Sequence, residues 1–221
     1  MSPTALVILS EGAEEIEAVT VADVLSRAEV KVTIGGLQGD GVIKGSNGVC
    51  IKPSVALSSV SSHLFDLVVM PGGMGGSKAM AESTLVGKIL KEHEKNNKYI
   101  AAICAAPIAL ESHGILKGKK LTSYPGFKEK LPSYTYCEDN VVVDDKLVTS
   151  RGPGTAFAFA MKLVELLCGD SKAQNLKKDL SSIFRALSSC LMSLNQSHSS
   201  TIYGTQNERI LRLQISRVWI K

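Results

Sequence analysis

Residues 99–110 read YIAAICAAPIAL, and the interpretation of the fold starts from this stretch. An apolar, β-rich run ends at Cys104, and a helical run that contains Pro107 follows after two small residues. A strand that turns sharply into a helix needs small neighbours, because the backbone there is strained and closely packed, and such a turn can present a nucleophile. Two interpretations stay open: Cys104 is a nucleophile at an elbow, or it is a small buried hydrophobic residue, as free cysteine usually is.

The same alternation of strand and helix extends to both sides of this stretch. Further apolar, β-rich runs lie at 4–9, 30–36, 65–73 and 146–150. Segments with helical spacing separate them, as over 16–25 and 85–93. Strand followed by helix, repeated, predicts an α/β fold with a doubly wound, mostly parallel sheet that is covered on both faces.

Turn signals mark two hairpins and the end of the folded body. Asn47-Gly48 predicts one hairpin and Asp144-Asp145 a second. The last helix is expected to begin near Pro153, which suits a first helical position, and to stop at Gly169.

The composition of the 221 residues is that of a globular protein. Apolar residues make up 44% and charged residues 21%, and no apolar run reaches the roughly 18 residues that a spanning helix needs. The five cysteines are odd in number and contain no CxxC pair, so neither a disulfide framework nor a zinc site is predicted. The N-terminus reads as a first strand without a basic leader, which favours a cytoplasmic protein.

A nucleophilic role for Cys104 requires help from its surroundings. A free thiol has a pKa near ~8.5, and a helix N-terminus contributes ~0.3 to 1 kcal/mol, less than the ~1.4 kcal/mol that one pKa unit represents. Hydrogen-bond donors must therefore also point at the sulfur. The turn SEGAEEIEAV carries four glutamates, one of which, if protonated, would donate to the sulfur and lower its pKa, whereas an ionised one would raise it. The alternative is that Glu11, Glu14 and Glu15 simply favour the positive end of the first helix.

Glycine-rich turns offer backbone donors. PGGMGGS at 71–77 follows a strand but fits neither a P-loop nor GxGxxG, so nucleotide binding is weakly supported. It suits an oxyanion hole in which Gly73 pairs with the amide of Ala105, or else it is only a tight turn into a helix. SRGPGT at 150–155 is a similar turn. The four histidines form no metal or catalytic pattern; we expect surface or structural roles, with His93 in a solvated charge run.

These motifs together resemble the parkinsonism-associated deglycase family of the DJ-one/PfpI superfamily. GAEEIE, DLVVMPGG, IAAICAAP and LTSRGPGT occur in the family's order, and the resemblance covers roughly residues 3–175. It implies a flavodoxin-like α/β/α sandwich that forms homodimers and needs no cofactor and no metal. It also implies Cys104 as an oxidisable nucleophile, Glu17 as its protonated partner, backbone amides near Gly72, Gly73 and Ala105, and a pocket lined by Pro153.

Three departures from the family bear on function. Close members carry a histidine near the cysteine where this sequence has Tyr124, a poor base at neutral pH, so histidine-assisted proton transfer is in doubt and Glu17 would serve alone. The protease-like branch places histidine where this chain has Ala105, which argues against peptide hydrolysis. The third is a C-terminal extension over 176–221 after a domain at 1–175.

The extension carries the basic charge of the chain. Residues 171–221 hold eight Lys or Arg against two acidic residues, a charge of +6, so the body is −2 although the whole chain is +4. We therefore expect no specific nucleic-acid binding by the body. Helical spacing over 180–194 and weak alternation over 211–215 allow either a poorly ordered tail or a segment that contacts a membrane surface or a partner.

The leading hypothesis is a cysteine-dependent deglycase or glutathione-independent glyoxalase. Its substrates would be small α-oxoaldehydes such as methylglyoxal, or glycated protein or nucleotide, and its role protection against oxidative stress. The alternative is a redox sensor and chaperone that acts through oxidation of Cys104 to sulfinic acid. A cysteine peptidase is the weaker third reading. The resemblance adds nuclear or mitochondrial placement to the cytoplasmic one.

Overall fold

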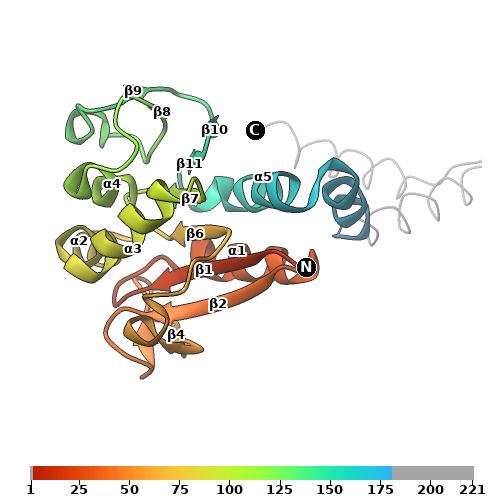
Figure 1. Ribbon diagram of the computed structural model, residues 1–221, viewed down its shortest axis with the longest axis horizontal. Coiled ribbons are helices and arrows are strands. Elements are labelled where there is room, and N and C mark those ends of the chain that lie inside the picture. Colours follow the sequence, from red (N-terminus) through yellow and green to blue (C-terminus); the bar gives the residue numbers. More distant parts are fainter. Residues whose placement is uncertain (1, 181–221) are drawn as a thin grey trace, which may run out of the picture. The chain divides into compact units, whose positions relative to one another are not determined.

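A seven-stranded sheet forms the centre of the part that the computed structural model describes, residues 2–180 (Figure 1). Its strand order is β10-β11-β7-β6-β1-β2-β5, and every neighbouring pair is parallel except β10 with β11. The strands are β1 (Thr4–Leu9), β2 (Lys31–Gly36), β5 (Val55–Ala56), β6 (Leu67–Met70), β7 (Tyr99–Ile103), β10 (Val141–Asp144) and β11 (Leu147–Ser150). The predicted α/β class with a mostly parallel sheet is confirmed.

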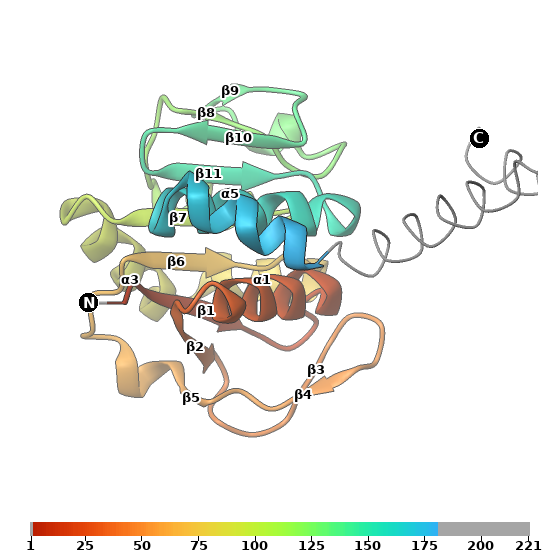
Figure 2. The same ribbon diagram turned by 90° about the vertical axis from the view of Figure 1, so that its right-hand side faces the viewer.

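Helices cover both faces of this sheet. They are α1 (Glu15–Arg27), α2 (Met74–Glu82), α3 (Thr84–Lys95), α4 (Pro107–His113) and α5 (Ala156–Cys168). Figure 2 shows α1 and α5 side by side on one face, and α2, α3 and α4 pack together on the other. Both faces of the inner strands are covered, and every residue of β6 and β11 is buried.

The two predicted hairpins are present. β3 (Ile43–Lys44) and β4 (Cys50–Ile51) pair antiparallel around the Asn47-Gly48 turn. β10 and β11 form the second, with the turn one residue later than expected because Asp145 takes the left-handed conformation at φ 57°. The sequence did not predict the small pair β8 (Lys120–Leu121) and β9 (Thr135–Tyr136), nor the 3-10 turns η1 (Leu57–Val60) and η2 (Lys128–Lys130).

The last helix begins as predicted at Pro153, with a 3-10 turn, η3 (Pro153–Thr155), that leads into α5. Gly169 ends α5 at φ 87°, and residues 170–180 are helical again. Contacts group Met1–Lys177 into one compact unit.

Two predictions for the C-terminal extension fall outside the described residues. They are the helical spacing over 180–194, except for its first residue, and the alternation over 211–215. Among the residues that the structure describes, no helix has the length and hydropathy to cross a membrane.

Candidate active site

Cys104 occupies a strained turn at the carboxyl end of β7. Its φ is 63°, in the left-handed region that costs an L-residue roughly 1 to 2 kcal/mol. The strand ends at Ile103 and α4 starts at Pro107, so the turn is the elbow that the sequence predicted. Backbone hydrogen bonds hold it from both sides: the Cys104 N–H donates to Ser150 O at 3.0 Å, and the Tyr124 N–H donates to Cys104 O at 2.8 Å.

Glu17 reaches the same place from the first turn of α1. Its side chain is fully buried, and Oε2 accepts a hydrogen bond from the Gly72 N–H at 2.6 Å. Oε1 has no hydrogen-bond partner among the described residues. Burial raises the pKa of Glu17 to about 7, the Gly72 N–H opposes this rise, and the charge of Glu14 adds to it. Near neutral pH this carboxyl group can therefore both hold and release a proton.

Gly72 lies between the thiol and the carboxyl group. A Cβ atom built there would lie 2.5 Å from Cβ of Cys104 and 2.7 Å from Oε2 of Glu17, so no other residue fits without movement. Gly73 follows with φ 79° at the start of α2, where a Cβ would lie 2.3 Å from Gly12 O. The backbone is thus able to approach both reactive groups closely.

The backbone N–H groups of Gly73 and Ala105 act on the Cys104 thiol, and both favour its thiolate form. The pKa of the thiol is nevertheless raised to about 12, first by burial and then by the charge of Glu17, with the two amides acting in the opposite direction. An ionised Glu17 thus raises the pKa of the thiol, which is the direction expected from the sequence for an ionised neighbour. Protonation of Glu17 removes that charge, so a thiolate is more favourable beside the neutral carboxyl group than beside the carboxylate.

Tyr124 and Pro153 lie on the loops that hold the elbow. The Tyr124 side chain is 49% exposed, and a Cβ atom at Gly152 would contact its Cδ2 at 3.3 Å. Its ring also meets Phe127 edge to face, with 6.4 Å between centroids. Pro153, half-buried, follows Gly152 at the start of η3. The structure therefore brings all seven sequence-predicted site residues to one end of the sheet.

The other glutamates of the first turn have separate tasks. Glu14 caps α1 by accepting the Glu17 N–H at 3.0 Å, as the helix interpretation predicted. Glu15 instead binds the β3–β4 turn, and accepts from the N–H groups of Asn47 and Val49 at 2.7 and 3.2 Å. Burial alone would raise the pKa of Glu15, but these hydrogen bonds outweigh it and lower the pKa to about 2. No local signal in the sequence indicated this contact.

The sequence placed His93 in a solvated segment, whereas the structure buries it. Its side chain is 1% exposed, its Nε2 accepts the Phe65 N–H at 3.0 Å, and its Nδ1 lies 2.7 Å from Ile89 O. It therefore has a structural role inside the core, because its spacing from Ile89 places it on the buried face of α3. Within residues 2–180, no three His, Cys, Asp or Glu side chains gather in a way that could hold a metal ion.

Comparisons with known proteins agree with this architecture. A model of the DJ-1/PfpI family matches residues 3–166. Protein dj-1beta of Drosophila melanogaster is 53% identical over 182 residues, which are 81% of this chain and 97% of that protein. Glutathione-independent glyoxalase DJR-1.2 of Caenorhabditis elegans is 43% identical over 180 residues, covering 80% and 95%. The crystal structure of Drosophila melanogaster DJ-1beta matches with a TM-score of 0.80, over 81% of this chain and 98% of that one.

Proposed function

The chain belongs to the DJ-1/PfpI family, and from that premise we propose that it is a cysteine-dependent glyoxalase that acts on small α-oxoaldehydes such as methylglyoxal. One observation carries the proposal: a strained Cys104 meets a buried carboxyl group with a pKa of about 7 and two backbone N–H donors. A relative at 43% identity that is named a glutathione-independent glyoxalase supports the same class of reaction.

The reaction begins when the Cys104 sulfur adds to the aldehyde carbon. The thiol proton passes to Glu17 as the carbon–sulfur bond forms, and Glu17 then gives this proton to the carbonyl oxygen, which becomes the hydroxyl of a hemithioacetal. Glu17 is a carboxylate again at the end of this step. We propose that the N–H groups of Gly73 and Ala105, which favour the thiolate, also donate to the negative charge that develops on that oxygen.

Glu17 then moves the proton that isomerises the adduct. Its carboxylate takes the proton from the former aldehyde carbon and returns it to the neighbouring ketone carbon, while the hydroxyl proton of the first carbon passes to the ketone oxygen. The first carbon is thereby oxidised and the second is reduced within one molecule. The product is a thioester of a 2-hydroxy acid, and water cleaves it to release lactate and the free thiol. A pKa of about 7 suits both halves of this transfer at neutral pH.

The test is methylglyoxal turnover by the purified full chain, with lactate measured directly. We expect Cys104→Ala to lose all turnover above the uncatalysed rate. The matched control is Cys137→Ala, which removes another free, partly buried thiol and should leave turnover unchanged. Equal turnover by the Cys104→Ala variant would contradict the proposal.

Glycated proteins and nucleotides are the finer substrate proposal. Early adducts of methylglyoxal with thiols and amines are in equilibrium with the free aldehyde, so an enzyme that consumes the aldehyde also removes them. Direct action requires adduct loss that is faster than spontaneous release. Adduct decay is measured with the unchanged chain and, as the reference for spontaneous release, with Cys104→Ala protein. Decay with the unchanged chain that exceeds the rate of spontaneous release would support direct action.

A redox role for the same thiol is the second candidate function. Cys104 is partly accessible, whereas burial protects most of the surrounding core. Peroxide would oxidise its thiolate first to sulfenic and then to sulfinic acid, and each step consumes one peroxide. Mass spectrometry after peroxide titration should find Cys104 doubly oxidised before the other cysteines. Oxidation of exposed Cys50 ahead of it would argue against the sensor.

We also propose the homodimer that the family resemblance implies. Large apolar side chains are exposed on α1 and on the neighbouring β3–β4 hairpin: Ile16 at 55%, Val19 at 51% and Val49 at 54%. A second copy of the chain is the proposed cover for them. Solution mass should report a dimer for the full chain and a monomer for Ile16→Glu, while an unchanged mass would contradict this interface.

A further inference from the structure

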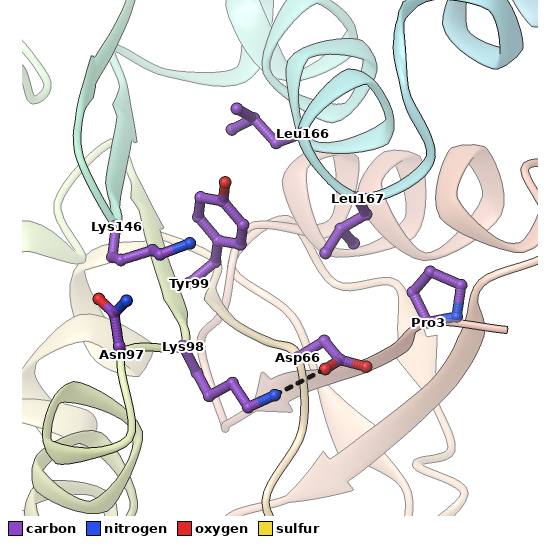
Figure 3. A pocket seen from close by; sticks show the side chains of 8 residues that line it. All are labelled: Pro3, Asp66, Asn97, Lys98, Tyr99, Lys146, Leu166 and Leu167. Atoms are coloured by element: carbon purple, nitrogen blue, oxygen red, sulfur yellow. Dashed lines mark hydrogen bonds and ion pairs between the residues drawn. The ribbon is translucent and has the colours of Figure 1, made fainter. Parts of the chain in front are cut away.

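A cavity of about 360 Å³ lies at the opposite end of the sheet from Cys104 (Figure 3). Residues that directly precede four neighbouring strands line it: Pro3 before β1, Asp66 before β6, Lys98 before β7 and Lys146 before β11. Because these strands are parallel, their amino ends share one edge. Tyr99 starts β7 here, and Cys104 follows its far end about 16 Å away at ~3.3 Å per residue. The cavity is therefore separate from the candidate active site.

The charged groups of this cavity leave one positive charge in excess. Asp66 is fully engaged: Oδ1 accepts from Lys98 Nζ at 2.9 Å, and Oδ2 accepts from the N–H and the hydroxyl of Thr4, both at 3.0 Å. This fixes Lys98 at the wall of the cavity. Lys146 has no carboxylate partner among the described residues, and its Nζ lies 4.0 Å from the centre of the Tyr99 ring.

An apolar wall faces these ammonium groups. Figure 3 shows the Tyr99 ring between Lys146 and the side chains of Leu166 and Leu167, which come from the last turn of α5. The volume is at the small end of the range for ligand sites, and equals about a dozen waters at their share of liquid volume. A ligand here meets cationic donors on one side and apolar carbons on the other.

We propose that this cavity binds a small amphipathic anion, that is, one phosphate or carboxylate group joined to a short apolar group. The anionic group contacts Lys146 and Lys98, since an ammonium donates charge-assisted hydrogen bonds to either kind of oxygen. The apolar group packs on Leu166 and Leu167. The site is independent of the proposed function, because no residue that lines the cavity belongs to the Cys104 turn.

The test uses phenyl phosphate with the full chain and follows backbone amide shifts by NMR. We expect saturable shifts at Lys98, Tyr99 and Lys146 below about 10 mM, and none of comparable size at Cys104. Lys146→Met keeps the aliphatic stem and should weaken binding roughly tenfold or more, whereas Lys146→Arg should retain it. The matched control is Lys130→Met, since Lys130 also lies over an aromatic ring, 4.8 Å from that of Phe127, but does not line the cavity.

Two further ligands separate the contributions of charge and apolar surface. Inorganic phosphate and benzyl alcohol each carry one half of the proposed ligand, and both should bind more weakly than phenyl phosphate. If benzyl alcohol binds as tightly as phenyl phosphate, the ligand need not be an anion and that assignment fails. If inorganic phosphate binds as tightly as phenyl phosphate, the proposed packing of an apolar group on Leu166 and Leu167 fails. Absence of saturable shifts, or equal affinity of Lys146→Met and Lys130→Met, would overturn the site itself.

Discussion

The Glu17 carboxyl group and the Cys104 thiol meet across Gly72, and each sets the ionisation of the other. The charge of Glu17 is the second cause, after burial, of the raised pKa of Cys104, and the thiol hydrogen bond in turn favours the ionised form of Glu17. The protonation states of the two groups are therefore linked, and a proton on Glu17 favours the thiolate form of Cys104.

The first prediction concerns Glu17→Gln and the thiol. Glutamine keeps the size of the side chain and can still accept the Gly72 N–H, but it carries no charge. The pKa of Cys104 should therefore fall below that of the unchanged protein, which thiolate ultraviolet absorbance measures during a pH titration. Methylglyoxal turnover should fall by roughly 100-fold or more, since the proton carrier is lost. An unchanged thiol pKa would show that the two groups do not interact.

The same substitution should change stability with a defined pH dependence. The pKa of Glu17 is raised from 4.5 to about 7, so folding favours its protonated form. The stabilisation that Glu17 contributes is complete below about pH 4.5 and is lost as pH rises through about 7, at a cost of up to about 3 kcal/mol. Urea unfolding should show Glu17→Gln more stable than the unchanged protein at pH 8, with a smaller difference at pH 5. A stability difference between the two proteins that shrinks with rising pH would contradict a raised pKa of Glu17.

Gly72→Ala tests how closely the thiol and the carboxyl group approach. The added methyl group would meet Cys104 Cβ and Glu17 Oε2, so we expect a loss of roughly 1 to 3 kcal/mol in unfolding free energy together with loss of turnover. Gly41→Ala is the matched control, because a Cβ there has no atom within 4 Å. Similar unfolding midpoints for the two variants would show that the loop around Gly72 can move to accommodate the methyl group at little cost in stability.

Glu15→Gln should loosen the β3–β4 hairpin without touching the thiol. The neutral amide is a weaker acceptor for the Asn47 and Val49 N–H groups, and we expect a loss of roughly 1 to 3 kcal/mol. Since the pKa of Glu15 is lowered to about 2, its contribution is present above pH 4.5 and is lost as pH falls toward 2. Hydrogen exchange at the Asn47 and Val49 amides should accelerate at pH 7, and protection equal to that of the unchanged protein would contradict this role.

Tyr124→Phe separates the two roles that a tyrosine can have beside the elbow. The Tyr124 hydroxyl has no hydrogen bond to another described residue, whereas the ring contacts Gly152 and Phe127. We therefore expect kcat/KM for methylglyoxal to stay within about threefold in Tyr124→Phe. In Tyr124→Ala, which removes the aromatic ring beside the elbow, we expect KM to rise. A loss beyond tenfold in Tyr124→Phe would assign the hydroxyl a part in proton transfer.

Some features of the site were readable from neighbouring residues alone. The elbow at Cys104 follows from an apolar strand, small flanking residues and Pro107, all within twelve positions. The burial of His93 was also accessible, because the helical spacing that places Ile89 in the core places His93 beside it. The charged residues around His93 are typical of a solvated segment, but they lie on the exposed side of α3.

Other features depended on contacts between distant segments. The cluster of glutamates does not by itself separate Glu17 from Glu15, and only the family resemblance pointed to Glu17. The two side chains leave α1 about 200° apart, so one meets the thiol and the other meets the hairpin. The cavity at the amino ends of the strands likewise unites residues from Pro3 to Leu167.

The sequence by itself determined the alternation of the main strands and helices, the two hairpins and the position of Cys104 at a turn, because periodicity and turn chemistry act over a few residues. Only the tertiary structure decided the protonation of the Glu17 and Cys104 pair and the task of Glu15. Those properties depend on desolvation and on hydrogen bonds from Gly72, Gly73 and Asn47, which lie far from α1 in the chain and near it only after folding.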